Sequence, residues 1–168
     1  VTMAKLQRIQ PCLWFDRNGE EAASFYTSVF PHSSIGAITH YSDEGHEFHH
    51  MPSGHALTVS FQLDGMDFLA LNGGPSFRFN EAVSLVVHCD TQQEIDHYWS
   101  RLGEGGDPAA QQCGWLKDRF GVSWQIVPEP WMRLLVSGEQ TGIDRGMRAM
   151  FAMKKLNLAE LLAAYEGR

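Results

Sequence analysis

The sequence uses one pattern twice, and an internal repeat of this kind narrows the possible folds more than any other feature. The first copy reads IQPCLWFD from Ile9 and continues as EEAASFYTSVF from Glu20. The second copy reads VSLVVHCD from Val83 and continues as QQEIDHYWSRL from Gln92. In each copy an apolar run of strand length ends at an aspartate and precedes apolar residues at helical spacing. The sequence therefore predicts a strand followed by a helix, in two tandem copies.

More strands are expected after each predicted helix. The strand-like segments are residues 35–41, 56–63 and 66–71 after the first helix, and residues 113–117 and 122–127 after the second. Asp64-Gly65 joins two of these segments and is a strong signal for a two-residue hairpin. The sequence thus predicts an α+β fold of two βαβββ modules, about 9–72 and 83–128, of which the second has shortened or lost one strand.

The sequence changes character beyond Pro128, where prolines break the last strand. Helices are predicted at residues 131–136, 144–153 and 158–165. Asn157 followed by Glu160 has the spacing of a capping box that begins the last of them. We expect one domain over residues 1–168, with a helical tail at about 129–168. This tail either packs onto the sheet or supplies a dimer contact.

Length, charge and cysteine content limit the classes of function. A chain of 168 residues can bury a core without disulfides, and its net charge of −7 argues against a general nucleic-acid binder. No apolar run approaches the roughly 20 residues that cross a bilayer, and the first residues lack the pattern of a secretory signal. We therefore expect a cytoplasmic protein without nucleic-acid or membrane partners. Cys12 and Cys89 lie in apolar runs and are expected to be buried, reduced thiols.

Several strings in the sequence resemble one known family. They are PCLWFD, EEAASFYTSVFP, TVSFQLDG, FLALNGGP, CGWLKDRFGVSWQIVP and MKKL. On these strings the chain resembles the PhnB-like family, whose members are commonly labelled 3-demethylubiquinone-9 3-methyltransferase. The family resembles in turn the vicinal oxygen chelate superfamily of glyoxalases, extradiol dioxygenases and bleomycin-resistance proteins. The resemblance implies two modules that curl into a sheet partly enclosing a small organic ligand, and it implies a homodimer.

The resemblance also raises the question of a metal ion. Metal-dependent members of the superfamily hold the ion through the first and last strand of each module, and matching places these positions at Gln10, Ala70, Ser84 and Gln125. Ala70 offers no ligand atom, and divalent ions normally require imidazole or carboxylate groups. We therefore expect no cofactor and no metal centre of the usual kind. A metal-dependent lyase, isomerase or dioxygenase with other ligands stays an alternative.

Histidines gather instead in one polar segment between predicted strands. His46, His49 and His50 form an HxxHH pattern that could capture zinc or nickel. The same segment is also interpreted as a solvated, mobile loop over the cavity mouth, or as a lid whose charge changes near neutral pH. His88 and His97 are expected to have structural roles.

The predicted cavity combines neutral hydrogen-bonding groups with aromatic walls, which suits a small organic ligand. The candidate ligand-binding residues are Gln10, Trp14, Asn72, Ser84, Trp115, Asp118 and Gln125. Neutral amides are poor general bases, so no catalytic residue is assigned, and acid–base chemistry would fall to a lid histidine or to Asp118. The 118–121 segment is also predicted to be a tight hairpin turn, in which Gly121 supplies a positive φ.

The family label implies methyl transfer, which usually requires a glycine-rich turn between a buried parallel strand and a helix to hold S-adenosylmethionine. Neither glycine-rich segment has this context. Residues 72–75 precede two phenylalanines rather than a helical pattern, and residues 103–106 follow a helix. The leading hypothesis is therefore a small-molecule-binding protein or enzyme of unproven activity, and methyl transfer is the last of the three hypotheses.

Overall fold

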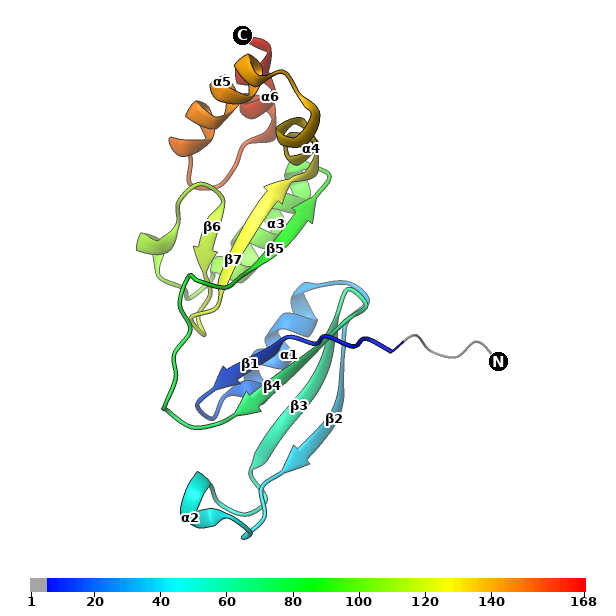
Figure 1. Ribbon diagram of the computed structural model, residues 1–168, viewed down its shortest axis with the longest axis vertical. Helices are drawn as coiled ribbons and strands as arrows, with labels where there is room; N and C mark the ends of the chain where they lie inside the picture. The colour runs from blue at the N-terminus through cyan, green and yellow to red at the C-terminus, as the bar shows by residue number, and fades with distance from the viewer. Residues whose placement is uncertain (1–5) are drawn as a thin grey trace, which may run out of the picture. The chain divides into compact units, whose positions relative to one another are not determined.

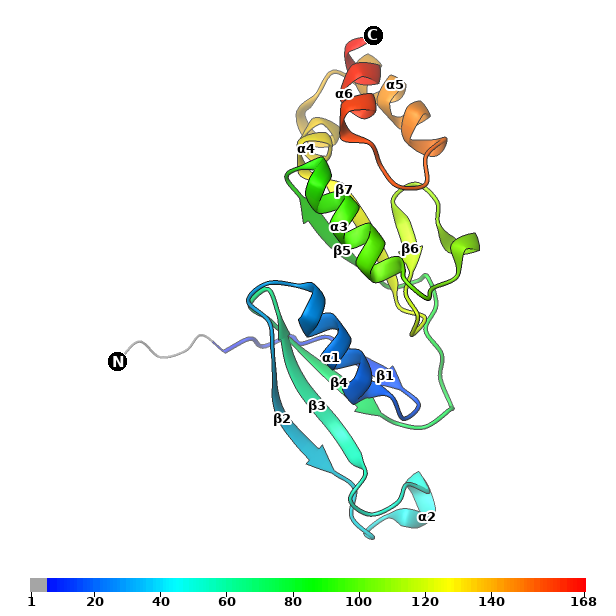
Figure 2. The same cartoon turned by 180° about the vertical axis from the view of Figure 1, so that it is seen from behind.

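The computed structural model describes residues 6–168, which form two compact units, one for each sequence repeat (Figures 1 and 2). Unit 1 ends at Arg78, and unit 2 comprises Phe79–Arg168. Each unit combines one β-sheet with helices, which confirms the predicted α+β class. The expectation of a single domain stays a prediction. Within residues 6–168 no helix has the length and apolar character that a membrane crossing requires.

Unit 1 is the complete first module. Its elements are β1 (Cys12–Phe15), α1 (Gly19–Val29), β2 (Ser34–His40), α2 (His46–His49), β3 (Ala56–Leu63) and β4 (Met66–Asn72). The strands form one sheet in the order β1-β4-β3-β2, in which β1 runs parallel to β4 and the other neighbours are antiparallel. Asp64 and Gly65 both have positive φ, 47° and 80°, and this confirms the predicted two-residue hairpin.

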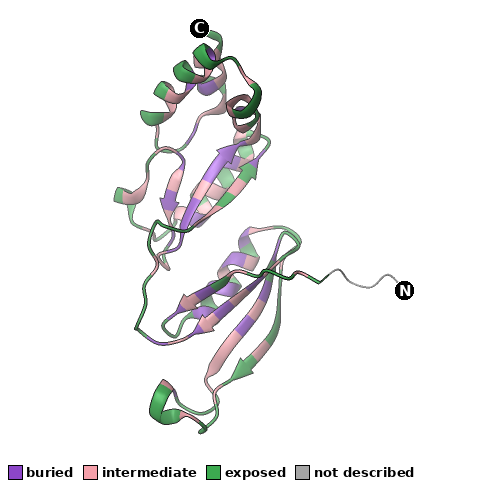
Figure 3. Cartoon of the chain, in the orientation of Figure 1, coloured by how far each residue is buried: buried purple, intermediate pink, exposed green. Residues whose placement is uncertain are grey.

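Alternation along the strands gives the sheet of unit 1 two different faces (Figure 3). One face packs against α1, where the ring of Phe61 stacks on the rings of Tyr26 and Phe68. Each large apolar side chain buried there contributes about 1.5–3 kcal/mol to stability. The opposite face carries polar residues such as Ser60 and Gln62, and no helix within residues 6–78 lies on it (Figure 1). We call it the open face of unit 1.

Unit 2 holds the second module and the helical tail. Its elements are β5 (Ser84–Cys89), α3 (Gln92–Gly103), the 3-10 helix η1 (Pro108–Ala110), β6 (Trp115–Lys117), β7 (Ser123–Pro128), α4 (Glu129–Ser137), α5 (Gln140–Phe151) and α6 (Leu158–Glu166). The sheet order is β5-β7-β6, with β5 parallel to β7. The short η1 follows α3 where a strand follows α1 in unit 1, so the predicted loss of one strand is confirmed.

The tail forms a small apolar core of its own with the end of β7. Val127, Trp131, Leu156 and Leu161 are buried together at its centre. The side chain of Asn157 accepts a hydrogen bond from the backbone N–H of Glu160 at 3.0 Å, as predicted for the start of α6. Packing onto the sheet was one of the two interpretations of the tail, and a dimer contact stays a prediction.

Helix α5 begins at Gln140, four residues before the predicted start at Asp144. The two glycines near its beginning weaken the helical pattern in the sequence. In the structure they are required by close packing, because a Cβ at Gly142 would lie 2.7 Å from the ring of Tyr165. The glycines therefore mark a tight contact between helices rather than a break in one.

Candidate functional site

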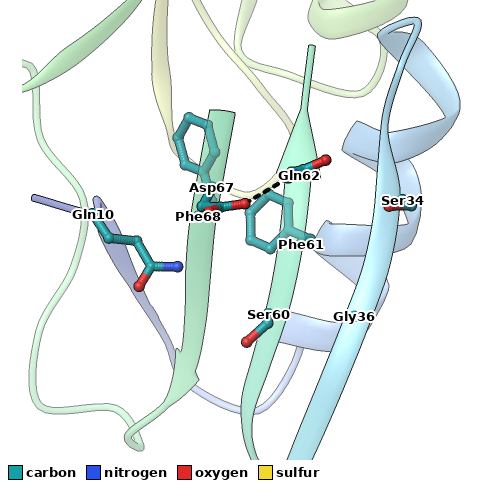
Figure 4. Close-up of a pocket in the computed structure, with 8 residues that line it drawn as sticks. All are labelled: Gln10, Ser34, Gly36, Ser60, Phe61, Gln62, Asp67 and Phe68. Atoms are coloured by element: carbon teal, nitrogen blue, oxygen red, sulfur yellow. Dashed lines mark hydrogen bonds between the residues drawn. The ribbon is translucent and has the colours of Figure 1, made fainter. Parts of the chain in front are cut away.

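The open face of unit 1 contains a cavity of about 330 Å³ (Figure 4). The residues that line it are Gln10, Ser34, Gly36, Ser60, Phe61, Gln62, Asp67 and Phe68. They come from the beginning of β2, the end of β3, the beginning of β4 and the segment before β1. Of these, Gln10 was among the candidate polar residues from the sequence.

Strand register explains how the polar groups of this cavity meet. Gln62 lies opposite Asp67 across β3 and β4, and its Nε2 donates a hydrogen bond to Asp67 Oδ1 at 2.8 Å. Strand β2 changes register between Ile35 and Ile38, next to Gly36. A Cβ at Gly36 would lie 3.6 Å from Ser60 Cβ, so any side chain there would extend toward Ser60. The bulge and the glycine together leave space above the sheet.

The expectation that Ala70 shares a face with Gln10 is wrong. Ala70 pairs with Leu13 in the parallel β1–β4 register and is buried on the face that α1 covers. The open-face positions of β4 are Asp67, Leu69 and Leu71 instead. The matching was displaced by one residue, and a displacement of one residue on a strand moves a side chain to the other face.

Asn72 also lies on the helix-covered face, so its side chain is not part of the cavity. Its Oδ1 accepts a hydrogen bond from the backbone N–H of Gly19 at 2.8 Å, and its Nδ2 donates to the carbonyl oxygen of Ala56 at 3.0 Å. With 1% exposure, Asn72 joins the start of α1 to the start of β3. This is a structural role that a single sequence does not distinguish from a ligand contact.

We expect Asn72→Ala to lower the free energy of unfolding by about 2 kcal/mol, because it leaves two buried backbone groups without partners. Urea unfolding followed by circular dichroism measures this. The matched control is Gln62→Ala on the exposed open face, which should change stability by less than about 0.5 kcal/mol. Equal effects of the two variants would contradict the structural role of Asn72.

Trp14 is on the open face by alternation, but the segment after β4 covers part of its ring. Its Nε1 donates a hydrogen bond to the carbonyl oxygen of Gly74 at 2.9 Å. Its ring lies edge-on to the ring of Phe77, with the two ring centroids 4.8 Å apart. A Cβ at Gly73 would lie 2.3 Å from the Trp14 ring. Packing against Trp14 thus explains the glycine at position 73, whereas Gly74 has φ of 92°, a conformation that glycine adopts readily.

The histidine segment is not a bare loop, because it contains the short helix α2 and a buried anchor, Met51. The ring of His49 packs against the ring of Tyr41 at an angle of 39°, with the ring centroids 4.5 Å apart. Its Nδ1 accepts a hydrogen bond from the Met51 N–H at 2.9 Å, and its Nε2 lies 3.1 Å from the carbonyl oxygen of Glu44. Both ring nitrogens are therefore engaged by the backbone.

The HxxHH pattern does not assemble a metal site in this conformation. The ring of His46 lies near the rings of His49 and His50. A metal ion could bind His49, however, only if one of the hydrogen bonds between its ring and the backbone broke. Across residues 6–168 no three histidine, cysteine, aspartate or glutamate side chains gather in a geometry that could hold a metal ion. The segment joins the end of β2 to the start of β3, at the other end of the sheet from the cavity (Figure 1).

Unit 2 brings three of the predicted residues together on one face of its sheet. Gln125 on β7 lies beside Trp115 on β6, and its Nε2 donates a hydrogen bond to Ser84 Oγ on β5 at 2.9 Å. Helix α3 covers the opposite face (Figure 2). We call the face with Ser84, Trp115 and Gln125 the open face of unit 2. Lys117 and Ser123 also lie on it by strand alternation.

Asp118 serves the hairpin rather than the rim of a cavity. Its Oδ1 accepts hydrogen bonds from the backbone N–H groups of Phe120 and Val122, at 2.8 and 3.0 Å. Its Oδ2 accepts from Trp124 Nε1 at 2.8 Å, and the residue is 2% exposed. Gly121 has φ of 91°, as the predicted hairpin turn requires. The carboxylate oxygens are thus occupied by the protein itself.

The residues at the positions implied by the superfamily do not fit a divalent metal ion. Leu69 and Leu71, the open-face neighbours of Ala70, have no ligand atoms. Gln10, Ser84 and Gln125 are neutral, and Gln125 already donates to Ser84. A site of neutral oxygens compensates a divalent charge poorly.

The glycine-rich segments do not form a nucleotide-binding turn either. Gly73 and Gly74 follow β4, and the next element along the chain is strand β5 rather than a helix. The second glycine segment begins at Gly103, the last residue of α3, and continues after that helix. In the described part of the chain neither glycine segment lies between a parallel strand and a helix, which is where such a turn binds a cofactor.

Cys12 and Cys89 differ in burial, and neither has the environment of a nucleophile. Cys89 is buried as expected, and burial raises the pKa of its thiol to about 12. The expectation for Cys12 is wrong, because alternation along β1 places it on the open face of unit 1, where it is exposed. Desolvation nevertheless raises the pKa of Cys12 above its ordinary value. Neither thiol is activated as a thiolate.

Comparison with known proteins gives a family and several related structures. Residues 7–127 match the model of the family described as 3-demethylubiquinone-9 3-methyltransferase. A solved PhnB protein from Bacillus cereus is 34% identical, with a TM-score of 0.61 over 73% of this chain and 99% of its own. A protein from Pseudomonas aeruginosa is 23% identical, with a TM-score of 0.55 over 74% of this chain and 98% of its own. A search of curated proteins finds no match.

The family match ends at residue 127, one residue before the end of β7, so the helical tail lies outside it. Each of the two related structures is matched over nearly its whole length by about three quarters of this chain. The matched part contains both sheets and both open faces. The chain therefore belongs to the 3-demethylubiquinone-9 3-methyltransferase family.

Proposed function

We propose that the protein binds a small organic molecule on the open faces of its sheets, through hydrogen-bonding side chains and without a resident metal ion. The observation that carries this proposal is the cavity of about 330 Å³ on the open face of unit 1. A volume of about 300–1,000 Å³ is typical of small-molecule sites. Among the described residues, the side chains of Gln10 and Ser60 have no hydrogen-bond partner there.

The polar groups of the cavity favour a ligand with hydroxyl, carbonyl or amine groups. Asp67 uses Oδ1 to accept from Gln62, and a carboxylate has a second oxygen that can accept from a ligand. Gln10 and Ser60 can each donate and accept hydrogen bonds. These groups orient a ligand, whereas proton transfer would require a group placed at the reacting atoms. Binding is therefore the activity with the most support.

Filling the cavity should abolish this binding. Ser60→Phe places a ring between Gln10 and Gly36, so we expect at least a tenfold rise in the Kd of any ligand found for the wild type. A set of small polyols, phenols and amines, together with S-adenosylmethionine, is screened by ligand-observed NMR at equal concentrations.

The matched control is Ser24→Phe, the same change on the exposed side of α1. Ligands should bind this variant as they bind the wild type. Equal weakening by both variants, or no binding of any compound, would overturn the proposal. Saturable binding of S-adenosylmethionine that survives Ser60→Phe would favour methyl transfer instead.

A further inference from the structure

We propose that the open face of unit 2 binds the anionic group of an organic acid, and that Glu81 occupies this anion site until a ligand displaces it. The inference rests on the proposed function, because it names the class of molecule that one open face takes. It is carried by four side chains that the sheet places together, namely Ser84, Lys117, Ser123 and Gln125.

Strand register brings these four side chains side by side. Ser123 on β7 pairs with Ser84 on β5 and with Lys117 on β6. Neighbouring strands are about 4.8 Å apart, so side chains at paired positions on one face are within reach of one another. Gln125 follows two residues after Ser123 on the same face. Three strands thus contribute to one polar cluster.

Ser123 is a buried hydroxyl that lacks a partner. It is 2% exposed, and among the described residues no group forms a hydrogen bond with its Oγ. Buried hydroxyls in folded proteins almost always have a partner, so an unpaired one requires an explanation. A ligand acceptor group above the sheet supplies that partner.

Ser84 can direct a second hydroxyl proton to the same place. Its Oγ accepts a hydrogen bond from Gln125 Nε2 at 2.9 Å, so its own proton is left for another acceptor. Together with the ammonium group of Lys117, the face offers two hydroxyl donors and one cation. This donor set matches a carboxylate, which has only acceptor oxygens.

Glu81 already presents such a carboxylate to Lys117. Glu81 precedes β5, and its Oε1 is in direct contact with Lys117 Nζ. The hydrogen bond from Lys117 lowers the pKa of Glu81, so the group is a carboxylate at neutral pH. Lys117 is half-buried, whereas Glu81 is mostly exposed and not held in the sheet. The acid can therefore leave while the lysine stays.

Trp115 extends the site beyond its anionic centre. It is half-buried on the same face, beside Gln125 and two residues from Lys117. Its indole ring offers apolar surface next to the cation. The class of ligand that fits is a small carboxylic acid with an aromatic or other apolar body.

The test uses benzoate and its neutral analogue benzamide, followed by amide and indole chemical shifts of the full chain. Benzoate should shift the signals of Ser123 and Trp115 and bind more tightly than benzamide. Glu81→Gln removes the internal competitor and should lower the Kd of benzoate about fivefold, with benzamide unchanged. Lys117→Met should abolish benzoate binding while the circular dichroism spectrum stays that of the wild type.

Glu104→Gln is the matched control, because Glu104 is an exposed acid of unit 2 that pairs with Arg119. It should leave the Kd of benzoate unchanged. The inference is overturned if Glu81→Gln leaves benzoate binding unchanged or weaker, if Glu104→Gln tightens it equally, or if the shifts lie elsewhere. These outcomes leave the Ser60→Phe experiment unaffected, so failure of the anion site is distinguishable from failure of the proposed function.

Discussion

Replacing Asp118 by alanine is expected to lower the free energy of unfolding by about 3–5 kcal/mol, because three N–H donors lose a buried acceptor. The donors are two backbone groups of the 118–122 turn and the indole of Trp124. Loss of these hydrogen bonds should loosen the turn between β6 and β7 and also the position of the Trp124 ring. Urea unfolding gives the free energy, and near-ultraviolet circular dichroism reports the environment of Trp124.

Asp118→Asn separates the hydrogen bonds from the shape of the side chain. Asparagine keeps one acceptor oxygen but has an amide NH2 group in place of the other oxygen. That NH2 group cannot accept a hydrogen bond from an N–H group. The free energy of unfolding of Asp118→Asn should therefore lie between that of the wild type and that of the alanine variant. A stable alanine variant that loses only ligand binding would contradict the hairpin role and favour Asp118 as a rim residue.

The features that follow from local rules could be predicted from the sequence. Alternation and helical spacing located both repeats, and Asp64-Gly65 predicted its hairpin because few residues other than glycine and aspartate suit two positive φ angles. Asn157 predicted the start of α6 because its side chain can accept from Glu160. Each of these signals lies within a few residues of the feature that it predicts.

The site residues were harder to predict, because they depend on partners far along the chain. Ala70 was placed on the wrong face by a displacement of one residue, which the sequence alone does not correct. Asn72 is a polar residue at a strand end in either role, and only its bonds to Gly19 and Ala56 reveal the structural one. Ser123 was missed because serine in a strand is common, and its missing partner is visible only in three dimensions.

Gly146→Ala should lower the free energy of unfolding by about 3 kcal/mol, although the same change inside an exposed helix normally raises it by about 1 kcal/mol. The sign reverses because a Cβ at Gly146 would lie 2.2 Å from Cη2 of Trp131. Trp131 is fully buried at the centre of the tail core, so its ring has no free space to move into. Chemical unfolding of the full chain measures the change.

A second substitution shows whether the clash is the cause. Trp131→Phe shortens the ring that meets Gly146, so Gly146→Ala should cost at least about 1 kcal/mol less in this background. Arg148→Ala, an exposed change on the same helix, should alter stability by less than about 0.5 kcal/mol. If Gly146→Ala stabilises the protein in both backgrounds, α5 does not pack on Trp131. The face of α5 toward Trp131 would then be available for the alternative role of the tail, a dimer contact.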